Sequence, residues 1–244
     1  MGYQWRTVLR NWPDLLHGLG TTVSLALLAF LLALVLALVA AVGRNSHNKV
    51  LRAIASVYVE AIRNTPVLLQ IYIVYFGLPS LGIRFNAYTA GIIALGVNIG
   101  AYLAETLRAG LNDVPHSQVE ASEILGLNKA TIFWIVVLPQ AIRKVYPTIV
   151  NYLIVAILGT SLMSGLALTE LTGTGLIINS RTLLWVQVFT ILLVLYLILS
   201  FVFSTIGSVV GQAIFKPPLE GLRRSVKLPN RAKVSAETVT EDAR

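Results

Sequence analysis

The chain has 244 residues, of which 56% are hydrophobic and only 12% are charged, and its mean hydropathy is +0.75. A soluble domain carries about 25% charged residues, so this composition excludes an ordinary water-soluble protein and indicates a one-domain integral membrane protein. The absence of cysteine excludes a disulfide, a Cys-metal site and a Cys nucleophile. The net charge of +8 fits basic loops beside anionic membrane lipid, and we expect no nucleic-acid partner.

The first apolar run covers residues 21–42 and consists almost entirely of Leu, Ala and Val. A helix of about 20 mostly apolar residues crosses a bilayer, so this run predicts the first span. Trp5 and Trp12 precede it, as is typical of aromatic residues at a membrane interface. We expect no cleavable signal peptide, because no charged segment leads directly into a short apolar core.

The second predicted span, residues 54–78, contains two charged residues and a proline. Glu60 and Arg63 lie in its first third and are three residues apart, so they share one face of a helix. Pro66 removes a backbone hydrogen bond and predicts a kink in this helix.

The third predicted span, residues 87–111, is also interrupted by polar residues. Asn98, Glu105 and Arg108 lie within it, and several glycines thin one of its sides. Small residues let helices approach closely in a bilayer, so we expect this side to pack against another span.

A polar stretch, residues 120–147, follows the third span and is too long for a tight turn; we call it the polar hairpin. Its residues predict a helix, a break at Gly126 in the left-handed conformation, and a second helix capped by Asn128. Leu138 and Pro139 are expected to end or bend that second helix. A helical hairpin beside a membrane is suited to docking onto another protein.

The remaining chain contains two more spans, at residues 145–168 and 183–210, joined by a Gly/Thr/Asn-rich loop at 169–182. Glu170 opens this loop, and we interpret it as an exposed acid rather than a contact for a delivery protein or a substrate ammonium. The tail from residue 216 to 244 is polar and contains prolines, which predicts partial disorder.

The distribution of basic residues predicts the orientation. Thirteen Lys or Arg residues lie after the first span, in the polar hairpin and in the tail. Four lie on the other side: Arg6, Arg10, Arg84 and Arg181. By the positive-inside rule the hairpin and the C-terminus are cytoplasmic and the N-terminus is outside, as five spans require.

The polar hairpin resembles the EAA loop of ABC importer permeases, on Glu120-Ala121-Ser122, Gly126 and Leu138-Pro139. Three further stretches are similar to polar amino acid permeases: NIGAYLAETLRAG at 98–110, YVEAIRNTP at 58–66 followed by Gln70, and Pro139-Gln140-Ala141 with Thr160-Ser161-Leu162. The resemblance covers residues 15–215, and four motifs in the family's order make it specific.

This resemblance implies an all-α membrane protein of about five spans, with a coupling helix between the third and fourth, in a bacterial inner membrane. Residues 1–215 would form the permease domain and 216–244 a cytoplasmic tail. The family imports polar amino acids such as histidine, glutamate, glutamine, arginine and opines. Its partners would be two ABC ATPase subunits, a second permease (identical or paralogous), a periplasmic amino-acid-binding protein and membrane lipid.

The resemblance assigns the ATPase-coupling role to six residues of the hairpin: Glu120, Ala121, Ser122, Gly126, Leu138 and Pro139. The small side chains let a partner's backbone approach, Gly126 makes the turn, and Glu120 offers a charge to a basic partner. An ordinary amphipathic surface helix is the alternative.

Eight residues within the spans are candidates for the substrate path: Arg63, Gln70, Asn98, Tyr102, Glu105, Arg108, Thr160 and Ser161. Charges inside a bilayer need partners, so the arginines form either structural ion pairs or a binding site for a substrate carboxylate. The uncharged polar groups form either hydrogen bonds between helices or a shallow cavity for a zwitterion.

Two features limit the expected chemistry. No GxxxxGK[ST] sequence is present, so ATP hydrolysis is expected in a partner subunit, and we expect no catalytic residues, cofactor or metal. Many relatives of the resembled family carry a Lys-Asp or Lys-Asn pair where this chain has Leu158-Gly159. The missing lysine weakens the case for an anionic substrate.

Two alternatives stay open on the sequence. A gradient-driven secondary amino acid transporter usually has more spans and inverted repeats, which this chain lacks. A membrane-embedded enzyme or structural subunit is the other, although no catalytic constellation is present.

Overall fold

A computed structural model of the chain describes residues 2–215, which contain helices and connections but no strand. The α-helices are α1 (Gly2–Leu9), α2 (Trp12–Arg44), α3 (Lys49–Arg63), α4 (Val67–Tyr72), α5 (Ala87–Asn112), α6 (His116–Ile124), α7 (Lys129–Thr131), α8 (Leu138–Gly159), α9 (Leu171–Thr182) and α10 (Trp185–Ile214). Two π-helical turns (Ile73–Gly77 and Ile132–Val137) and two 3-10 turns (Leu78–Leu81 and Thr160–Leu166) extend them. The tail at 216–244 lies outside the described residues.

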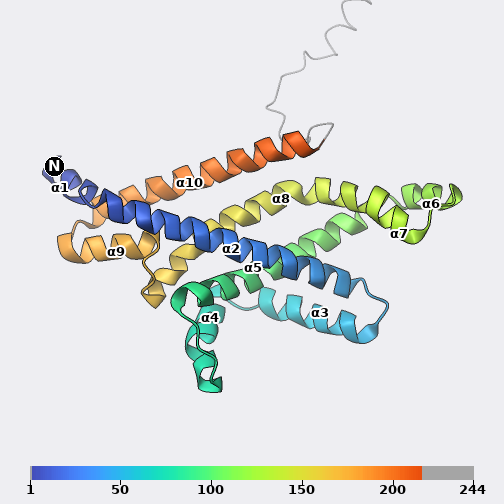
Figure 1. Ribbon diagram of the computed structural model, residues 1–244, viewed down its shortest axis with the longest axis horizontal. Helices are drawn as coiled ribbons and strands as arrows, with labels where there is room; N and C mark the ends of the chain where they lie inside the picture. The colour runs from blue at the N-terminus through green and yellow to red at the C-terminus, as the bar shows by residue number, and fades with distance from the viewer. Residues whose placement is uncertain (1, 216–244) are drawn as a thin grey trace, which may run out of the picture.

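Four helical segments are long and apolar enough to cross a membrane: Trp12–Arg44, Ala87–Asn112, Lys129–Leu166 and Trp185–Ile214. They run along the long axis of the molecule, with α6 and α7 at one end and α1 and α9 at the other (Figure 1). A shorter apolar segment, Val67–Leu81, is the fifth. The prediction of an all-helical membrane protein is confirmed, whereas the orientation of the helices stays a prediction.

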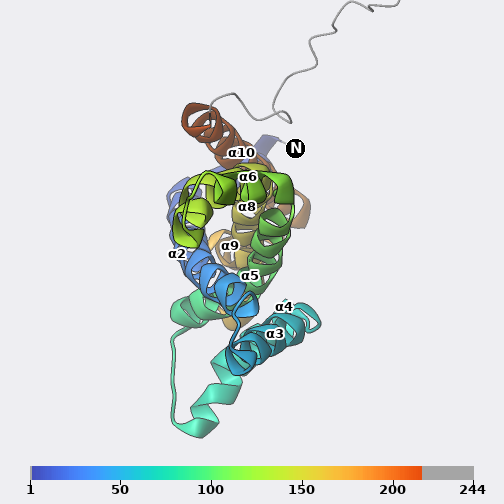
Figure 2. The same ribbon diagram turned by 90° about the vertical axis from the view of Figure 1, so that its right-hand side faces the viewer.

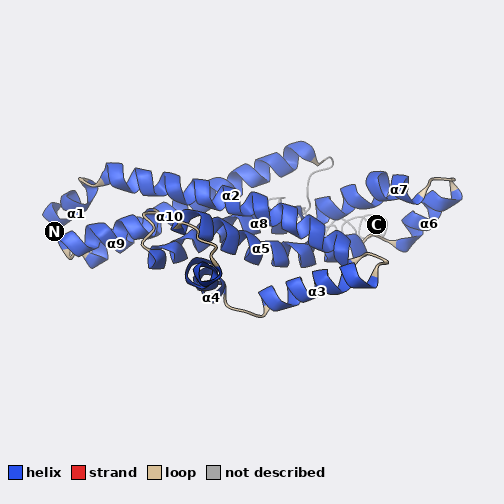
Figure 3. Ribbon diagram, turned by 60° about the horizontal axis from the view of Figure 1, so that its bottom comes forward, coloured by secondary structure: helices blue, strands red, loops and turns tan. Residues whose placement is uncertain are grey.

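The second predicted span is not one helix. It is divided at Asn64–Pro66 into α3 and the segment that begins with α4, and α4 turns away from the bundle (Figures 1 and 3). Pro66 has no N–H to donate and biases the preceding residue away from the helical conformation, so the helix stops here instead of kinking. The Gln70 side-chain amide donates to the carbonyls of Ile62 (2.9 Å) and Thr65 (3.2 Å), and the Ile62 carbonyl also accepts from the Thr65 amide (3.4 Å).

The core lies between α2 and α5, which lie side by side along most of their length. The buried face of α2 is a stripe of alanines: Ala26, Ala29, Ala33, Ala37 and Ala40. On α5, a Cβ at Gly96 or Gly100 would lie 3.1 or 3.2 Å from the backbone oxygen of Ala29 or Ala33. The small residues therefore bring the two backbones together, as the thinned side of the third span predicted.

The outer face of α2 is apolar as well. Leu31, Val35 and Leu38 are exposed on the side away from the alanine stripe. A helix that is apolar all round, with its large side chains pointing outward and its small ones inward, is typical of a helix that faces lipid.

The predicted loop at 169–182 is a helix, α9, which packs against α2 and α10. Glycine and threonine are weak helix formers, and this composition suggested a loop. Tertiary packing overrides that preference, because Gly173 and Gly175 are buried where a side chain would collide with Leu168 or Leu192.

Candidate functional sites

The polar hairpin folds as its sequence predicted. α6 ends at a left-handed Gly126 (φ 78°), and the amides of Gly126 and Leu127 return to the carbonyls of Glu123 (2.9 Å) and Ser122 (3.2 Å). This pair of bonds satisfies two carbonyls that the helix end leaves free, and glycine takes the conformation without a Cβ clash. The Asn128 side chain then accepts from the Thr131 amide at 2.9 Å and caps the next helix.

The second helix of the hairpin does not end at Leu138 and Pro139. A π-helical turn, Ile132–Val137, leads directly into α8, and helix continues from Lys129 to Leu166. A widened turn shifts the backbone hydrogen-bond pattern by one residue just before Pro139, which itself has no N–H to donate. The hairpin is thus joined to a membrane-spanning helix without a loop.

The six residues assigned to coupling do not all face outward. Glu120, Ala121, Gly126 and Pro139 are exposed, Leu138 is half-buried, and Ser122 is buried with its hydroxyl donating to the Gln118 carbonyl at 2.7 Å.

Sequence reasoning missed the hairpin's most exposed apolar side chains, Ile124 (87% exposed) and Leu125 (79% exposed). The signal was present, because two large apolar residues stand directly before the glycine of an otherwise polar stretch.

The charged residues of the spans converge on one carboxylate, that of Glu105 on α5. It forms ion pairs with Arg44 from the end of α2, with Arg63 of α3 (3.6 Å) and with Arg108 one turn along α5. Arg44 also reaches Glu60 at 3.6 Å. The structural interpretation of these charges therefore has direct support, and Arg44, the missed member, joins three helices.

The polar side chains near the break in the second span belong to the same region. The Asn98 side-chain amide donates to the side-chain oxygen Oε1 of Gln70 at 3.0 Å, and the Tyr102 hydroxyl donates to the backbone carbonyl of Arg63 at 3.1 Å. The Arg63 guanidinium lies over the Tyr102 ring, 5.6 Å from its centre. These bonds join α5 to both halves of the broken span, and Arg63 Nε remains buried with no hydrogen-bond partner among the described residues.

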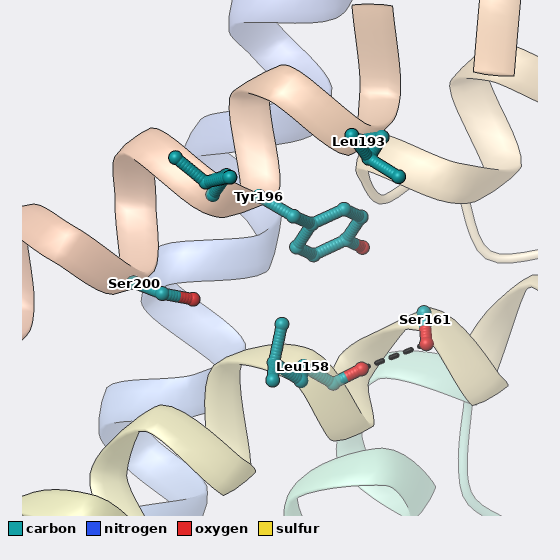
Figure 4. Close-up of a pocket in the computed structure, with 6 residues that line it drawn as sticks. Leu158, Ser161, Leu193, Tyr196 and Ser200 are labelled. Atoms are coloured by element: carbon teal, nitrogen blue, oxygen red, sulfur yellow. Dashed lines mark hydrogen bonds between the residues drawn. The ribbon is translucent and has the colours of Figure 1, made fainter. Parts of the chain in front are cut away.

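Thr160 and Ser161 lie apart from that region. Their hydroxyls donate to carbonyls of their own helix, those of Ile157 (2.8 Å) and Leu158 (2.7 Å). Ser161 lines a pocket of ≈ 410 Å³ between α8 and α10, and the ring of Tyr196 lies between the two elements (Figure 4). Leu158 lines the same pocket and makes part of its wall apolar.

Glu170 is fully buried, so the interpretation as an exposed loop acid is wrong. Its carboxylate caps α9 by accepting from the amides of Thr172 (2.8 Å) and Gly173 (2.7 Å), and it also accepts from the Tyr196 hydroxyl (3.0 Å) and that of Thr22 (3.5 Å). Burial raises the pKa of Glu170, and these donors partly oppose the rise. One acid thereby joins α2, α9 and α10.

The end-on view shows α2, α5 and α8 grouped in one bundle, with α3 and α4 to one side (Figure 2). Within residues 2–215, no three His, Asp or Glu side chains gather in a group that would hold a metal ion. The described residues thus present an exposed hairpin at one end, a polar region around a helix break, and a buried acid toward the other end.

Comparison with known proteins agrees with a multi-pass transport subunit. Residues 16–216 match the family described as binding-protein-dependent transport system inner membrane component. The chain is 37% identical to the probable amino-acid ABC transporter permease protein y4tG of Sinorhizobium fredii, over 81% of this chain and 86% of that protein. It is 35% identical to the L-cystine transport system permease protein TcyB of Bacillus subtilis, over 83% and 87%.

A solved structure titled "Crystal structure of an amino acid ABC transporter with histidines" superimposes with a TM-score of 0.81 at 32% identity, covering 86% of this chain and 98% of that one. The chain belongs to the binding-protein-dependent transport system inner membrane component family. The predictions of an ABC permease subunit and of a multi-pass bacterial inner membrane protein are confirmed.

Proposed function

We propose that this chain is the membrane-spanning subunit of an ATP-driven importer of polar amino acids, and that its polar hairpin docks onto a cytoplasmic ATPase. The observation that carries the docking is the exposed apolar pair Ile124 and Leu125 at the hairpin's turn. Exposed apolar side chains beyond the spans, on a rigid turn, are typical of a protein interface. The exposed Glu120 and Ala121 lie on the same helix and border this contact.

The hairpin is built to transmit force into the bundle. Only residues 113–115 separate α5 from α6, and the helix from Lys129 to Leu166 joins the hairpin's other arm to the bundle. At the base of the hairpin, Lys144 pairs with Asp113 at 2.6 Å, and a Cβ at Gly110 would lie 2.5 Å from the Val145 side chain. Closure of the ATPases would therefore move α5 and α8 together and switch the pore from inward- to outward-facing.

The proposed assembly contains two ATPase subunits, a second permease (identical or paralogous) and a periplasmic amino-acid-binding protein. The relatives support the class of substrate, because their names specify L-cystine and octopine, and the superimposed transporter was solved with histidines. The count of basic residues supports a cytoplasmic hairpin and an N-terminus outside.

The docking is tested with Gly126→Asp and Ala121→Arg in the full transporter. Gly126→Asp forces a side chain into a left-handed conformation, and Ala121→Arg adds bulk on the exposed helix face. We expect co-purification of the ATPase and transport to fall at least about tenfold, equal to about 1.4 kcal/mol of binding. The amount of permease inserted in the membrane stays the same.

Gly82→Asp is the matched control, because Gly82 is also left-handed (φ 83°) and also has open space around its Cβ position. It lies outside the hairpin, so the ATPase should still co-purify. Full ATPase co-purification and transport with both hairpin variants would exclude docking through this surface.

We further infer that the substrate path passes the region around the broken span, where Arg63, Gln70, Asn98, Tyr102, Glu105 and Arg108 come together. Arg63 supports this, because its side chain is 34% exposed and its closest ion-pair contact with Glu105 is 3.6 Å. The exposed part of that guanidinium retains donors for a substrate carboxylate, whereas its Nε is buried. The pocket beside Ser161, one residue after Thr160, is proposed as the second stretch of the path.

Transport measurements on Arg63→Gln and Arg108→Gln distinguish an arginine that binds substrate from one that stabilises the fold. Arg108 donates to Glu105 through both Nε and Nη2, so its loss should mainly lower stability. Arg63→Gln should raise the half-saturating amino acid concentration several-fold at normal expression. Equal half-saturation in wild type and Arg63→Gln would contradict a carboxylate contact here.

A further inference from the structure

A pocket with a largely polar lining lies at the end of the molecule opposite the hairpin, between the start of α2 and α9. It has a volume of ≈ 300 Å³, at the lower end of small-ligand pockets. Asp14 and His17 line it from α2, and Thr174, Ile177 and Arg181 line it from α9. The two sets recur at intervals of three or four residues, so each belongs to one helix face.

The two helices run in opposite directions at this pocket. Thr22 meets Glu170 at one point, and further along a Cβ at Gly18 would lie 2.6 Å from the Thr174 hydroxyl. The missing side chain at Gly18 lets α9 lie directly on α2. From Thr174 to Arg181 the face of α9 extends for about 10 Å.

The pocket contains opposite charges that do not neutralise each other. Asp14 and Arg181 are both exposed, and within residues 2–215 neither forms an ion pair or a side-chain hydrogen bond. The charge of each side chain is stabilised by the dipole of its own helix, since Asp14 lies in the first turn of α2 and Arg181 in the last turn of α9. The interaction with the helix dipole uses no hydrogen bond of either side chain, so the Arg181 donors and the Asp14 acceptors remain open to a ligand.

We propose that this pocket is an entry site for a free zwitterionic amino acid, separate from the path residues within the spans. Arg181 would bind the α-carboxylate, Asp14 the α-ammonium, and the hydroxyl of Thr174 a polar side chain, with Ile177 against its aliphatic part. The choice of amino acids as ligand rests on the proposed function. The location fits, because the end opposite the hairpin is where imported substrate first meets the permease.

The buried acid beside the pocket holds its two walls in register. Glu170 caps α9 and accepts from Thr22 of α2, while the Leu171 amide donates to the same Thr22 hydroxyl at 3.1 Å. This small network fixes the start of α9 one turn before Thr174. The site is therefore preorganised by neutral donors around a carboxylate that does not itself line the pocket.

The test measures binding of radiolabelled L-glutamine and L-histidine to the purified full chain in lipid nanodiscs, with no ATPase or binding protein present. We expect saturable binding at about millimolar concentration, as two exposed charge contacts supply only a few kcal/mol. The monoamide of glutaric acid lacks the ammonium and 4-aminobutanamide lacks the carboxylate. Each should compete at least about tenfold less well than L-glutamine.

Arg181→Gln and Asp14→Asn should each weaken binding about tenfold, and Arg181→Lys should keep part of the affinity. Arg84→Gln is the matched control, because Arg84 is an exposed arginine on the same predicted side of the membrane. Thermal unfolding of each variant in nanodiscs shows whether the fold is intact.

Three outcomes would overturn the proposal. These are binding unchanged by Arg181→Gln and Asp14→Asn, no saturable binding below about 10 mM, and, in a separate pull-down with a periplasmic binding protein added, variants that lose capture of that protein while amino acid binding is unchanged, which would make the pocket a protein interface. Loss of ATPase docking leaves this assay unaffected, so the entry site and the proposed coupling fail separately.

Discussion

Two acids at different depths of the bundle are held in different ways. Glu105, toward the hairpin end, is surrounded by the guanidinium groups of Arg44, Arg63 and Arg108. Glu170, toward the opposite end, accepts its hydrogen bonds within the described part of the chain from backbone amides and hydroxyls. The Glu105 side chain keeps 24% of its surface exposed, whereas Glu170 is fully buried.

The difference follows from what each acid has to join. Glu105 joins α2, α3 and α5 beside the hairpin, where arginines are long enough to reach water at the membrane surface. A network of ion pairs can exchange partners when helices shift, because any of three cations can approach the same carboxylate. Glu170 holds a short helix start in one place, and fixed amide donors suit a joint that stays closed.

The largest expected effect comes from removing the charge at Glu105. Glu105→Gln leaves Arg44, Arg63 and Arg108 close together, with Glu60 as their one remaining ion-pair partner among residues 2–215. Breaking a buried pair costs about 3–5 kcal/mol, and partial exposure reduces this to about 2–3 kcal/mol here. Thermal unfolding of the purified chain in nanodiscs should show a clear drop in Tm.

Glu105→Asp is the control, because it keeps the charge and shortens the side chain by one methylene. We expect about half of the loss. If Glu105→Gln were as stable as wild type at low salt, the three arginines would not depend on this acid, and the contrast with Glu170 would disappear.

Much of the fold follows from the sequence, because apolar length and charge are sufficient signals for membrane helices. The runs at 21–42 and 87–111 lie within α2 and α5, and the run at 183–210 begins two residues before α10 and lies otherwise within it. The hairpin was also predictable, since Gly126 and Asn128 act through local backbone geometry. Such features depend on residues within one or two turns.

The features that the sequence did not predict depend on contacts between residues that are far apart in the chain. Hydropathy predicted a continuous span across Pro66, but the break is stabilised by Gln70 and by Asn98 from another helix. The burial of Glu170 depends on Thr22, which is 148 residues away, and on Tyr196. No local pattern records those partners, so a capped, buried helix was interpreted as a loop.

A smaller effect is expected at Glu170, because its donors are neutral. Glu170→Ala removes the cap of α9 and leaves the amides of Thr172 and Gly173 and the Tyr196 hydroxyl without their acceptor. The expected cost is about 1–2 kcal/mol. Glu170→Gln keeps one acceptor oxygen and should lose less, and Glu123→Gln, an exposed acid on the hairpin, should lose nothing measurable.

The pH dependence distinguishes this acid from an ion-paired one. Burial raises the pKa of Glu170 above its ordinary value of 4.5. Between pH 4.5 and the raised pKa, the folded chain therefore binds more protons than the unfolded chain. This contribution to the free energy of unfolding is therefore complete below about pH 4.5 and decreases as the pH rises through the raised pKa. Unfolding curves of wild type and Glu170→Gln should separate most at low pH and approach each other as the pH rises. A gap that instead widens with pH would mean that the Glu170 carboxylate is stabilised in its charged form.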